Sequence, residues 1–347
     1  MKVGLIGYGY WGPNLLRNLH ETNGVEVKRC VDLNAERRAA ASKRYPSVEV
    51  SADAEEILSD AQINAVVLAT PVFTHYALAK RALEAGKHVF VEKPMTRTVK
   101  EAEELIALAE RKGLTLMVDH TFIYTGAVRR MKEIIEAGDL GELYYFDSVR
   151  VNLGPWRHDI DVIWDLAAHD LSILTYLIPD KPLSVSAEGA YHIEPGLVDV
   201  AYLTLHFANN FIANFHVNWL SPVKVRQNLI GGSKQMLVYD DMELNEKVRV
   251  YDRGIQVKSQ EGIYKALVDY RMGDVWSPKL DMREALSLEC EHFVDCVRNS
   301  TAPRSDGIAG LAVVRVLEAA STSLANDGAR VVLSREAESD ALPLTHQ

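Results

Sequence analysis

Three polar side chains in this chain have the types and spacing that proton transfer beside a developing negative charge requires. Lys93 follows a short apolar run, and a lysine ammonium there could donate to a substrate oxygen and stabilise its charge. Asp165 and His169 are four positions apart, so they share a face if their segment is helical. Histidine titrates near neutral pH, and a nearby carboxylate can orient the ring or a substrate hydroxyl. These residues predict a site for general acid–base chemistry.

Each of these residues also has a plainer interpretation. Lys93 can be a solvated surface lysine, since most lysines lie on the surface. Asp165 and His169 can form a polar pair on a buried helix. An Asp-x-x-x-His spacing could also belong to a metal site, but no third ligand stands at a matching spacing, so we expect no metal.

A glycine motif near the start of the chain predicts a dinucleotide site. Gly7, Gly9 and Gly12 form a G-x-G-x-x-G pattern after the apolar run 3–6, and Asp32 stands 20 positions after the last glycine. The first glycine permits a tight turn, the second lets the backbone approach a pyrophosphate, and the third allows close packing of helix and strand. The alternative is a glycine-rich turn in another kind of α/β domain.

The acidic residue after the second strand favours NAD over NADP. Asp32 would accept hydrogen bonds from the ribose hydroxyls of the cofactor and repel a 2′-phosphate. Arg37 and Arg38 stand nearby and leave NADP open as the less favoured cofactor. Because backbone amides at a helix N-terminus hold the pyrophosphate, few basic side chains are needed.

The elements that must position these residues alternate in kind over the first 120 residues, as in βαβ units with a parallel sheet. We expect strands at 3–6, 25–31, 65–69, 88–91 and 114–118, and helices at 11–20, 35–44, 74–85 and 99–111. Lys93 follows the fourth strand, at the carboxyl edge where open α/β sheets bind ligands. Pro94 disfavours a helix at Lys93. The fold class expected here is a doubly wound α/β Rossmann domain.

The pattern changes after residue 120, where consecutive strands joined by short turns predict a second, α+β domain with an open, mainly antiparallel sheet. We expect strands at 143–153, 183–190, 198–207, 211–217, 225–230, 236–238 and 247–251, and helices at 126–137, 283–298 and 308–326. The expected domains are residues 1–120 for the cofactor and 121–347 for substrate and assembly. The tail from Ser339 is expected to be loosely held.

Composition excludes several classes of protein. The chain has 347 residues, of which 48% are hydrophobic and 25% charged, as in a folded protein of about two domains. Three cysteines are too few for a disulfide framework and favour a reducing compartment. The net charge of −10, with no basic stripe, argues against a nucleic-acid surface. No apolar run suits a membrane span or a signal peptide, so we expect a cytoplasmic protein.

Taken together, the motifs resemble the Gfo/Idh/MocA oxidoreductase family. The resemblance covers nearly the whole chain and includes the glycine motif, Glu92-Lys93-Pro94, and Asp165 with His169. It implies a Rossmann domain, an open sheet that forms homodimer or homotetramer contacts, and hydride transfer between NAD(P) and a secondary hydroxyl of a sugar or cyclitol. Lys93, Asp165 and His169 become the expected catalytic residues. The expected cofactor-binding residues are Gly7, Gly9, Tyr10, Trp11, Gly12, Asp32, Arg37, Thr70, Pro71, His75, Glu92 and Lys93.

The segment 152–166 is similar to the branch of this family that acts on nucleotide-activated amino sugars. That similarity implies NAD-dependent oxidation of the 3-hydroxyl of UDP-N-acetylglucosamine to a ketone, which a partner aminotransferase would convert to an amine. Arg157 or Arg150 could hold a diphosphate, and Trp156 could stack on a sugar or base. Tyr124 and Asn152 are further candidates for hydroxyl contacts, and Lys93, Asp165 and His169 would also touch substrate. Each loop residue can instead have a surface role.

Other functions stay open on the sequence alone. A TDP-keto-sugar 3-ketoreductase, or an inositol or simple-sugar dehydrogenase, would use the same catalytic residues. A non-catalytic NAD(H)-binding redox sensor would keep the glycines and Asp32, but it would not need Lys93, Asp165 and His169 together. The presence of all three favours an enzyme.

Overall fold

The computed structural model describes residues 1–154, 156–257 and 268–333, and it divides the chain into two compact units. The first unit contains Met1–Thr125 and Met282–Glu318, and the second contains Gly126–Asp281 and the described chain from Ala319. The chain first passes from one unit to the other after Thr125, close to the expected boundary at residue 120. The return of 282–318 to the first unit differs from the two continuous domains that we expected. Pro155 and the tail from Ser339 lie outside the described residues.

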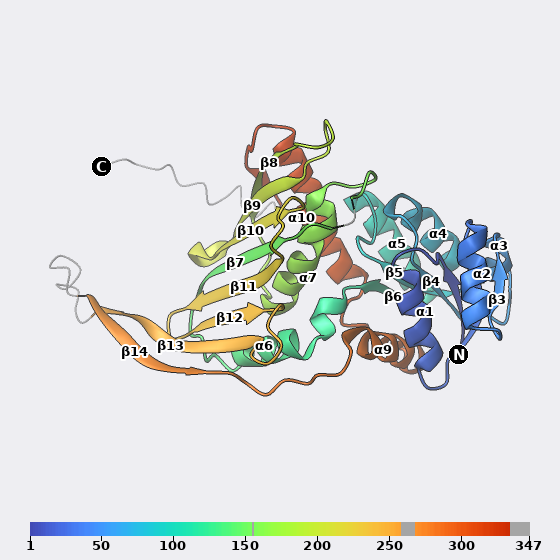
Figure 1. Ribbon diagram of the computed structural model, residues 1–347, viewed down its shortest axis with the longest axis horizontal. Coiled ribbons are helices and arrows are strands. Elements are labelled where there is room, and N and C mark those ends of the chain that lie inside the picture. Colours follow the sequence, from blue (N-terminus) through green and yellow to red (C-terminus); the bar gives the residue numbers. More distant parts are fainter. Residues whose placement is uncertain (155, 258–267, 334–347) are drawn as a thin grey trace. The chain divides into compact units, whose positions relative to one another are not determined.

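The returning segment has a physical reason to join the first unit. Its helix α9 (Ala285–Asn299) packs against α1 (Gly12–Glu21), and Figure 1 shows the two helices side by side. Phe293 of α9 is fully buried, and its ring lies 5.3 Å from the ring of Phe90. Arg17 of α1 and Glu284, at the start of α9, form an ion pair of 2.5 Å.

The first unit is built on a six-stranded parallel sheet in the order β3-β2-β1-β4-β5-β6. Its strands are β1 (Lys2–Ile6), β2 (Glu26–Val31), β3 (Glu49–Ser51), β4 (Ala65–Leu68), β5 (His88–Glu92) and β6 (Leu116–Asp119). This order is that of a Rossmann fold, in which ligands bind at the carboxyl edge beside the switch between β1 and β4. Every residue of β4 and β6 is buried, because helices cover both faces.

Further helices belong to the described part of this unit, and two of them have clear terminal signals. These helices are α2 (Ala35–Arg44), α3 (Glu55–Leu58), α4 (Val72–Glu84), α5 (Val99–Lys112), the 3₁₀ turn η1 (Thr121–Tyr124) and most of α10 (Gly307–Leu324). Asn34 caps α2 by accepting from the N–H groups of Glu36 and Arg37. Gly113, with φ of 64°, ends α5 in the left-handed conformation.

One helix among the described residues, α10, is long and apolar enough to cross a membrane. Half of its apolar window is buried, and Val314, Leu317 and Ala320 are fully buried. This burial is what the core helix of a folded protein shows.

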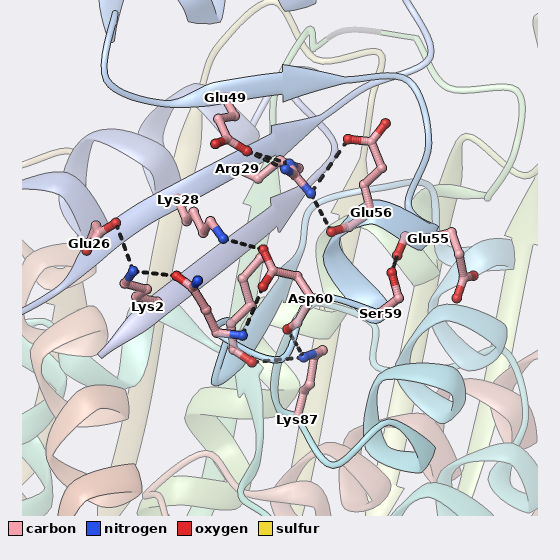
Figure 2. Close-up of polar contacts among 12 residues, drawn as sticks. Lys2, Glu26, Lys28, Arg29, Glu49, Glu55, Glu56, Ser59, Asp60 and Lys87 are labelled. Carbon is pink, nitrogen blue, oxygen red and sulfur yellow. Dashed lines mark hydrogen bonds and ion pairs between the residues drawn. The ribbon is translucent and has the colours of Figure 1, made fainter.

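The amino end of the first sheet carries a network of ionic contacts, which Figure 2 shows. Lys28 and Asp60 form an ion pair of 2.5 Å, and Lys87 donates at 2.8 Å to the backbone oxygens of Asp60 and Ile63. Burial lowers the pKa of Lys87, while the contact with Lys28 lowers the pKa of Asp60. The network lies at the opposite end of the strands from the ligand-binding edge, so it serves the fold rather than the site.

The second unit contains a nine-stranded sheet in the order β14-β13-β12-β11-β7-β10-β9-β8-β15. Its strands are β7 (Leu143–Val151), β8 (Ser184–Ala190), β9 (Val200–His206), β10 (Ile212–Asn218), β11 (Val225–Gly232), β12 (Met236–Asp240), β13 (Val248–Val257), β14 (Val268–Trp276) and β15 (Val331–Val332). Among the described strands of this sheet, only β7 and β10 pair in parallel, so the expected open, mainly antiparallel sheet is confirmed. Figure 1 shows β13 and β14 as two long strands side by side, and β14 forms one edge of the sheet.

One face of the second sheet is buried and the other is open. In β9, Ala201, Leu203 and Leu205 are buried, while the residues between them are partly or fully exposed. The helices of this unit are α6 (Gly126–Glu136), a π turn η2 (Ile163–Ala167), α7 (Ala168–Leu177), the short turn η3 (Ala208–Asn210) and the end of α10. Helix α7 packs on β7 on the buried side.

Candidate active site

The glycine turn after β1 has the geometry that a dinucleotide needs. Gly7 has φ of +101°, and a Cβ there would lie 2.4 Å from the Ala69 oxygen. A Cβ on Gly12 would lie 2.2 Å from the Gly7 oxygen. Both positions therefore require glycine for the fold itself. A Cβ on Gly9 would meet only the Arg37 guanidinium, at 3.5 Å, so the space above Gly9 remains open to a pyrophosphate.

Asp32 follows β2 at the same edge of the sheet. Its Oδ2 accepts from the Tyr8 N–H at 2.7 Å, and its Oδ1 accepts from the Asn34 N–H at 2.8 Å. Each carboxylate oxygen can accept a further hydrogen bond, so the pair of oxygens fits the two hydroxyls of a ribose. Arg37 Nη1 lies 3.7 Å from Oδ2, and its side chain is half exposed. The residues present thus fit an NAD-type cofactor.

The two aromatic residues of the glycine motif differ in their surroundings. The Tyr10 side chain is 83% exposed. Trp11 immediately precedes α1 and donates from Nε1 to the Asp119 carboxylate at 2.7 Å. Trp11 therefore links the glycine turn to the end of β6.

The loops after β4 and β5 are tied together through His75. This residue is 1% exposed, and its Nδ1 and Nε2 lie 2.9 Å from the Pro94 oxygen and 2.8 Å from the Thr70 oxygen. Thr70 and Pro71 follow β4, while Glu92 ends β5 and Lys93 follows it, both half-buried. His75 therefore positions the backbone on both sides of the expected cofactor site, and Lys93 lies at the carboxyl edge, as its motif predicts.

Two buried carboxyl groups of the first unit were not foreseen. Asp119 ends β6, in register with Glu92 of β5, and Glu289 lies on α9. A polar residue directly after the apolar run 114–118 was a usable signal for Asp119. No sequence signal pointed to Glu289, because its place depends on the return of α9 to the first unit.

In the second unit, Asp165 lies on the π turn η2, and His169 lies in the first turn of α7. A regular helix would place the two side chains on one face. The structure instead has a turn with i→i+5 hydrogen bonds, a feature that occurs often at functional sites. Asp161 begins this turn by accepting from the N–H groups of Ile163 and Trp164, both at 3.0 Å.

The Asp165 carboxylate is held by two neighbours. Trp219 Nε1 donates to its Oδ2 at 3.1 Å, and Arg157 Nη1 lies 3.8 Å from its Oδ1. Arg157 also forms a two-pronged ion pair with Asp159, at 3.0 and 2.9 Å, which lowers the pKa of Asp159. Trp156 packs its ring 5.2 Å from that of Trp219. These contacts place Arg157 and Trp219 beside the expected catalytic carboxylate of Asp165, with Trp156 packed against Trp219.

Three other expected substrate contacts have different surroundings. Asn152 has a buried Oδ1 that accepts no hydrogen bond from the described chain, which suits a ligand contact. Arg150 is 2% exposed and pairs with Asp170 of α7, and Tyr124 is 1% exposed with its hydroxyl 3.1 Å from Ser305 Oγ. Both side chains are interior and contribute to packing, and contact of Arg150 or Tyr124 with substrate stays a prediction.

Cysteines and metal ligands add no further site within the described ranges. Cys30, Cys290 and Cys296 are buried free thiols, and no group of three or more His, Cys, Asp or Glu residues there could hold a metal ion.

Family models and relatives cover most of the chain. The oxidoreductase family, NAD-binding Rossmann fold, matches residues 1–120, and the GFO/IDH/MocA C-terminal domain matches residues 128–238. The uncharacterized oxidoreductase YdgJ of Escherichia coli is 33% identical over 71% of this chain and 73% of that protein. The scyllo-inositol 2-dehydrogenase (NAD(+)) of Bacillus subtilis is 27% identical over 87% of this chain and 86% of that protein.

A further relative resembles the chain in both sequence and structure. UDP-N-acetylglucosamine 3-dehydrogenase of Acidithiobacillus ferrooxidans is 29% identical, covering 92% of this chain and 95% of that protein. A solved structure of that enzyme has a TM-score of 0.76 at 25% identity, over 93% of this chain and 97% of that chain. With its NAD-type Rossmann domain and open sheet, the chain belongs to the Gfo/Idh/MocA family of oxidoreductases.

Proposed function

We propose that this enzyme uses NAD to oxidise the 3-hydroxyl of a nucleotide-activated amino sugar, UDP-N-acetylglucosamine, to the 3-keto sugar. The observation that carries the reaction type is Lys93 at the carboxyl edge of the sheet that also bears the open glycine turn. The similarity over 92% of the chain to UDP-N-acetylglucosamine 3-dehydrogenase supports the substrate.

In this proposal Lys93, Asp165 and His169 act on the same hydroxyl group. NAD, when bound, supplies the hydride acceptor. His169 takes the hydroxyl proton, and the Lys93 ammonium donates to the oxygen as it gains negative charge. Asp165 orients the hydroxyl or the His169 ring, and Trp219 keeps the carboxylate in place through its indole N–H.

The preference for NAD over NADP is part of the proposal and is supported by Asp32. Two backbone N–H groups fix this carboxylate at the end of β2, and its negative charge disfavours a 2′-phosphate. Arg37 Nη1 lies 3.7 Å from Oδ2 of Asp32, so its positive charge acts against that preference.

The diphosphate and sugar contacts are assigned to the segment 152–166. Arg157 can present its planar guanidinium to a phosphate if it exchanges the Asp159 carboxylate for the ligand. Trp156 offers a ring face, and the buried Oδ1 of Asn152 offers an acceptor for a hydroxyl. These contacts would distinguish a nucleotide sugar from a free sugar.

Assembly through the open sheet face and a downstream partner complete the proposal. Tyr144 and Tyr202 are 50% and 55% exposed on the second sheet, and such aromatics are enriched in interfaces between subunits. We therefore assign a homodimer or homotetramer contact to this sheet, to be tested by light scattering.

In this proposal a partner aminotransferase converts the 3-keto product to an amine.

The substrate is tested by measuring NADH formation with a panel of sugars. We expect turnover with UDP-N-acetylglucosamine and none with free N-acetylglucosamine or inositol at equal concentration. Turnover of inositol alone would favour the activity named for the Bacillus subtilis relative. Tight NADH binding with no turnover of any sugar or keto sugar would favour a redox sensor.

A further inference from the structure

Two carboxyl groups lie side by side inside the first unit, next to the end of β5, and the mechanism above uses neither. Asp119 of β6 is 2% exposed and Glu289 of α9 is 0% exposed. Their carboxyl groups are within hydrogen-bonding reach of each other. Two buried acids in contact cannot both be ionised without a large electrostatic cost.

Asp119 has the surroundings of the ionised partner. It accepts hydrogen bonds from Trp11 Nε1 at 2.7 Å and from Thr121 Oγ1 at 2.5 Å. The parallel register pairs Asp119 with Glu92, the last residue of β5, and Lys93 directly follows that strand. The positive charge of Lys93 accordingly acts to lower the pKa of Asp119, against the burial that raises it.

Glu289 has the surroundings of the protonated partner. Both of its carboxyl oxygens are buried, and the Thr121 hydroxyl, which also interacts with Glu289, donates to Asp119 at 2.5 Å. Burial and the adjacent Asp119 raise the pKa of Glu289 well above its ordinary value. A proton on Glu289 would donate to Asp119, so that the buried carboxyl group of Glu289 is neutral and hydrogen-bonded.

We propose that Asp119 and Glu289 share one proton and present a single negative charge to Lys93, so that both are positioning residues for the reaction. The role at Lys93 rests on the proposed function, whereas the shared proton does not. Because Trp11 donates to the same carboxylate, the pair also ties the glycine turn to the end of β6.

Other titratable groups around the pair do not compete for this proton near pH 7. Burial raises the pKa of Tyr124 in η1 and of Cys290 on α9. Burial, together with the charge of Lys93, lowers the pKa of His120 to about 3. These three groups are neutral, so Lys93 and Glu92 at the end of β5 are the charged groups that act on the pair.

The shared proton is tested by infrared spectroscopy at pH 7, without substrate. The wild-type spectrum minus that of Glu289→Gln should contain the carbonyl stretch of a solvent-shielded, protonated carboxylic acid. The matched control is Glu291→Gln, an exposed position two residues further along the same helix. We expect no such band in the wild-type minus Glu291→Gln spectrum. Absence of the band from the Glu289 difference spectrum would overturn the proposal.

The positioning role is tested by the pH dependence of kcat/KM. In the double variant Asp119→Asn/Glu289→Gln neither acid can carry the negative charge beside Lys93, so we expect the alkaline limb to move down by about one pH unit or more. Glu289→Gln keeps the Asp119 charge and can still donate to it, so its alkaline limb should stay in place. A merely structural role would reduce stability without moving this limb.

The two readouts separate the possible failures. A wild-type alkaline limb in Asp119→Asn/Glu289→Gln would overturn the positioning role, even if the infrared band is present. Absence of turnover on every substrate would overturn the proposed function, and the positioning role with it, while the infrared band would still report the shared proton.

Discussion

Replacing two glycines of the same motif by alanine separates cofactor binding from folding. In Gly9→Ala the new methyl group would meet only the end of the Arg37 side chain, at 3.5 Å, which is ordinary van der Waals distance. In Gly12→Ala it would lie 2.2 Å from the Gly7 oxygen, so the backbone itself would have to move. The same chemical change therefore has opposite expected consequences three positions apart.

The expected sizes follow from these distances. Gly9→Ala should leave the free energy of unfolding unchanged or raise it by up to about 1 kcal/mol, because alanine restricts the unfolded chain. It should weaken NADH binding by about tenfold or more, which is about 1.4 kcal/mol, because the methyl group occupies the approach of the pyrophosphate. Gly12→Ala should lose about 1–3 kcal/mol of stability through overpacking, and the melting temperature should fall with it.

The assays are NADH titration followed by fluorescence and thermal unfolding followed by circular dichroism, for both variants and wild type. NADH binding of wild-type strength in Gly9→Ala would refute the assignment of the pyrophosphate to this turn. A loss of stability in Gly9→Ala as large as that in Gly12→Ala would refute the geometry itself.

Three further predictions address the catalytic groups, the substrate loop and the buried acids. Lys93→Met should lose most turnover, while its affinity for NADH in the titration stays near that of the wild type. Near-normal turnover in this variant would contradict the catalytic role of Lys93. His169→Asn should lose the acid limb of the pH profile of kcat/KM. Asp159→Asn removes the carboxylate that occupies Arg157, so KM for UDP-N-acetylglucosamine should fall in initial-rate measurements; a raised or unchanged KM would argue against a diphosphate contact at Arg157. The pKa of Glu289 is raised in the folded state, so the wild type should lose stability relative to Glu289→Gln as pH rises above 4.5. In urea unfolding the loss should reach up to about 1.4 kcal/mol per pH unit. A difference in unfolding free energy between the two proteins that stays constant from pH 5 to 9 would contradict a protonated Glu289.

Local patterns were enough to predict most of the first unit. The helix expected at 35–44 is observed with the same bounds, because Asn34 gives a clear N-cap and Pro46 a nearby stop. The carboxyl-edge placement of Lys93 followed from the strand at 88–91 and the parallel order of the sheet. Apolar runs and helix caps are local signals that predict each strand and helix, and their βαβ alternation predicts the parallel sheet.

Tertiary contacts explain what local patterns could not predict. The return of α9 to the first unit depends on Phe293 packing against Phe90, about 200 residues away along the chain. The burial of Arg150 depends on pairing with Asp170, and the π turn at Asp165 differs from the regular helix that a shared face with His169 would require. Strand β14 was not expected, and it pairs only with β13 at the edge of the sheet.

The most direct test of the central claim is to follow an isotope from the substrate to the cofactor. UDP-N-acetylglucosamine carrying deuterium on carbon 3 is incubated with the enzyme and NAD, and the reduced cofactor is analysed by mass spectrometry. The account predicts that deuterium appears in the reduced cofactor and that Lys93→Met forms little of it. Reduced cofactor without deuterium would show that the hydride comes from another position, and it would contradict the proposed reaction.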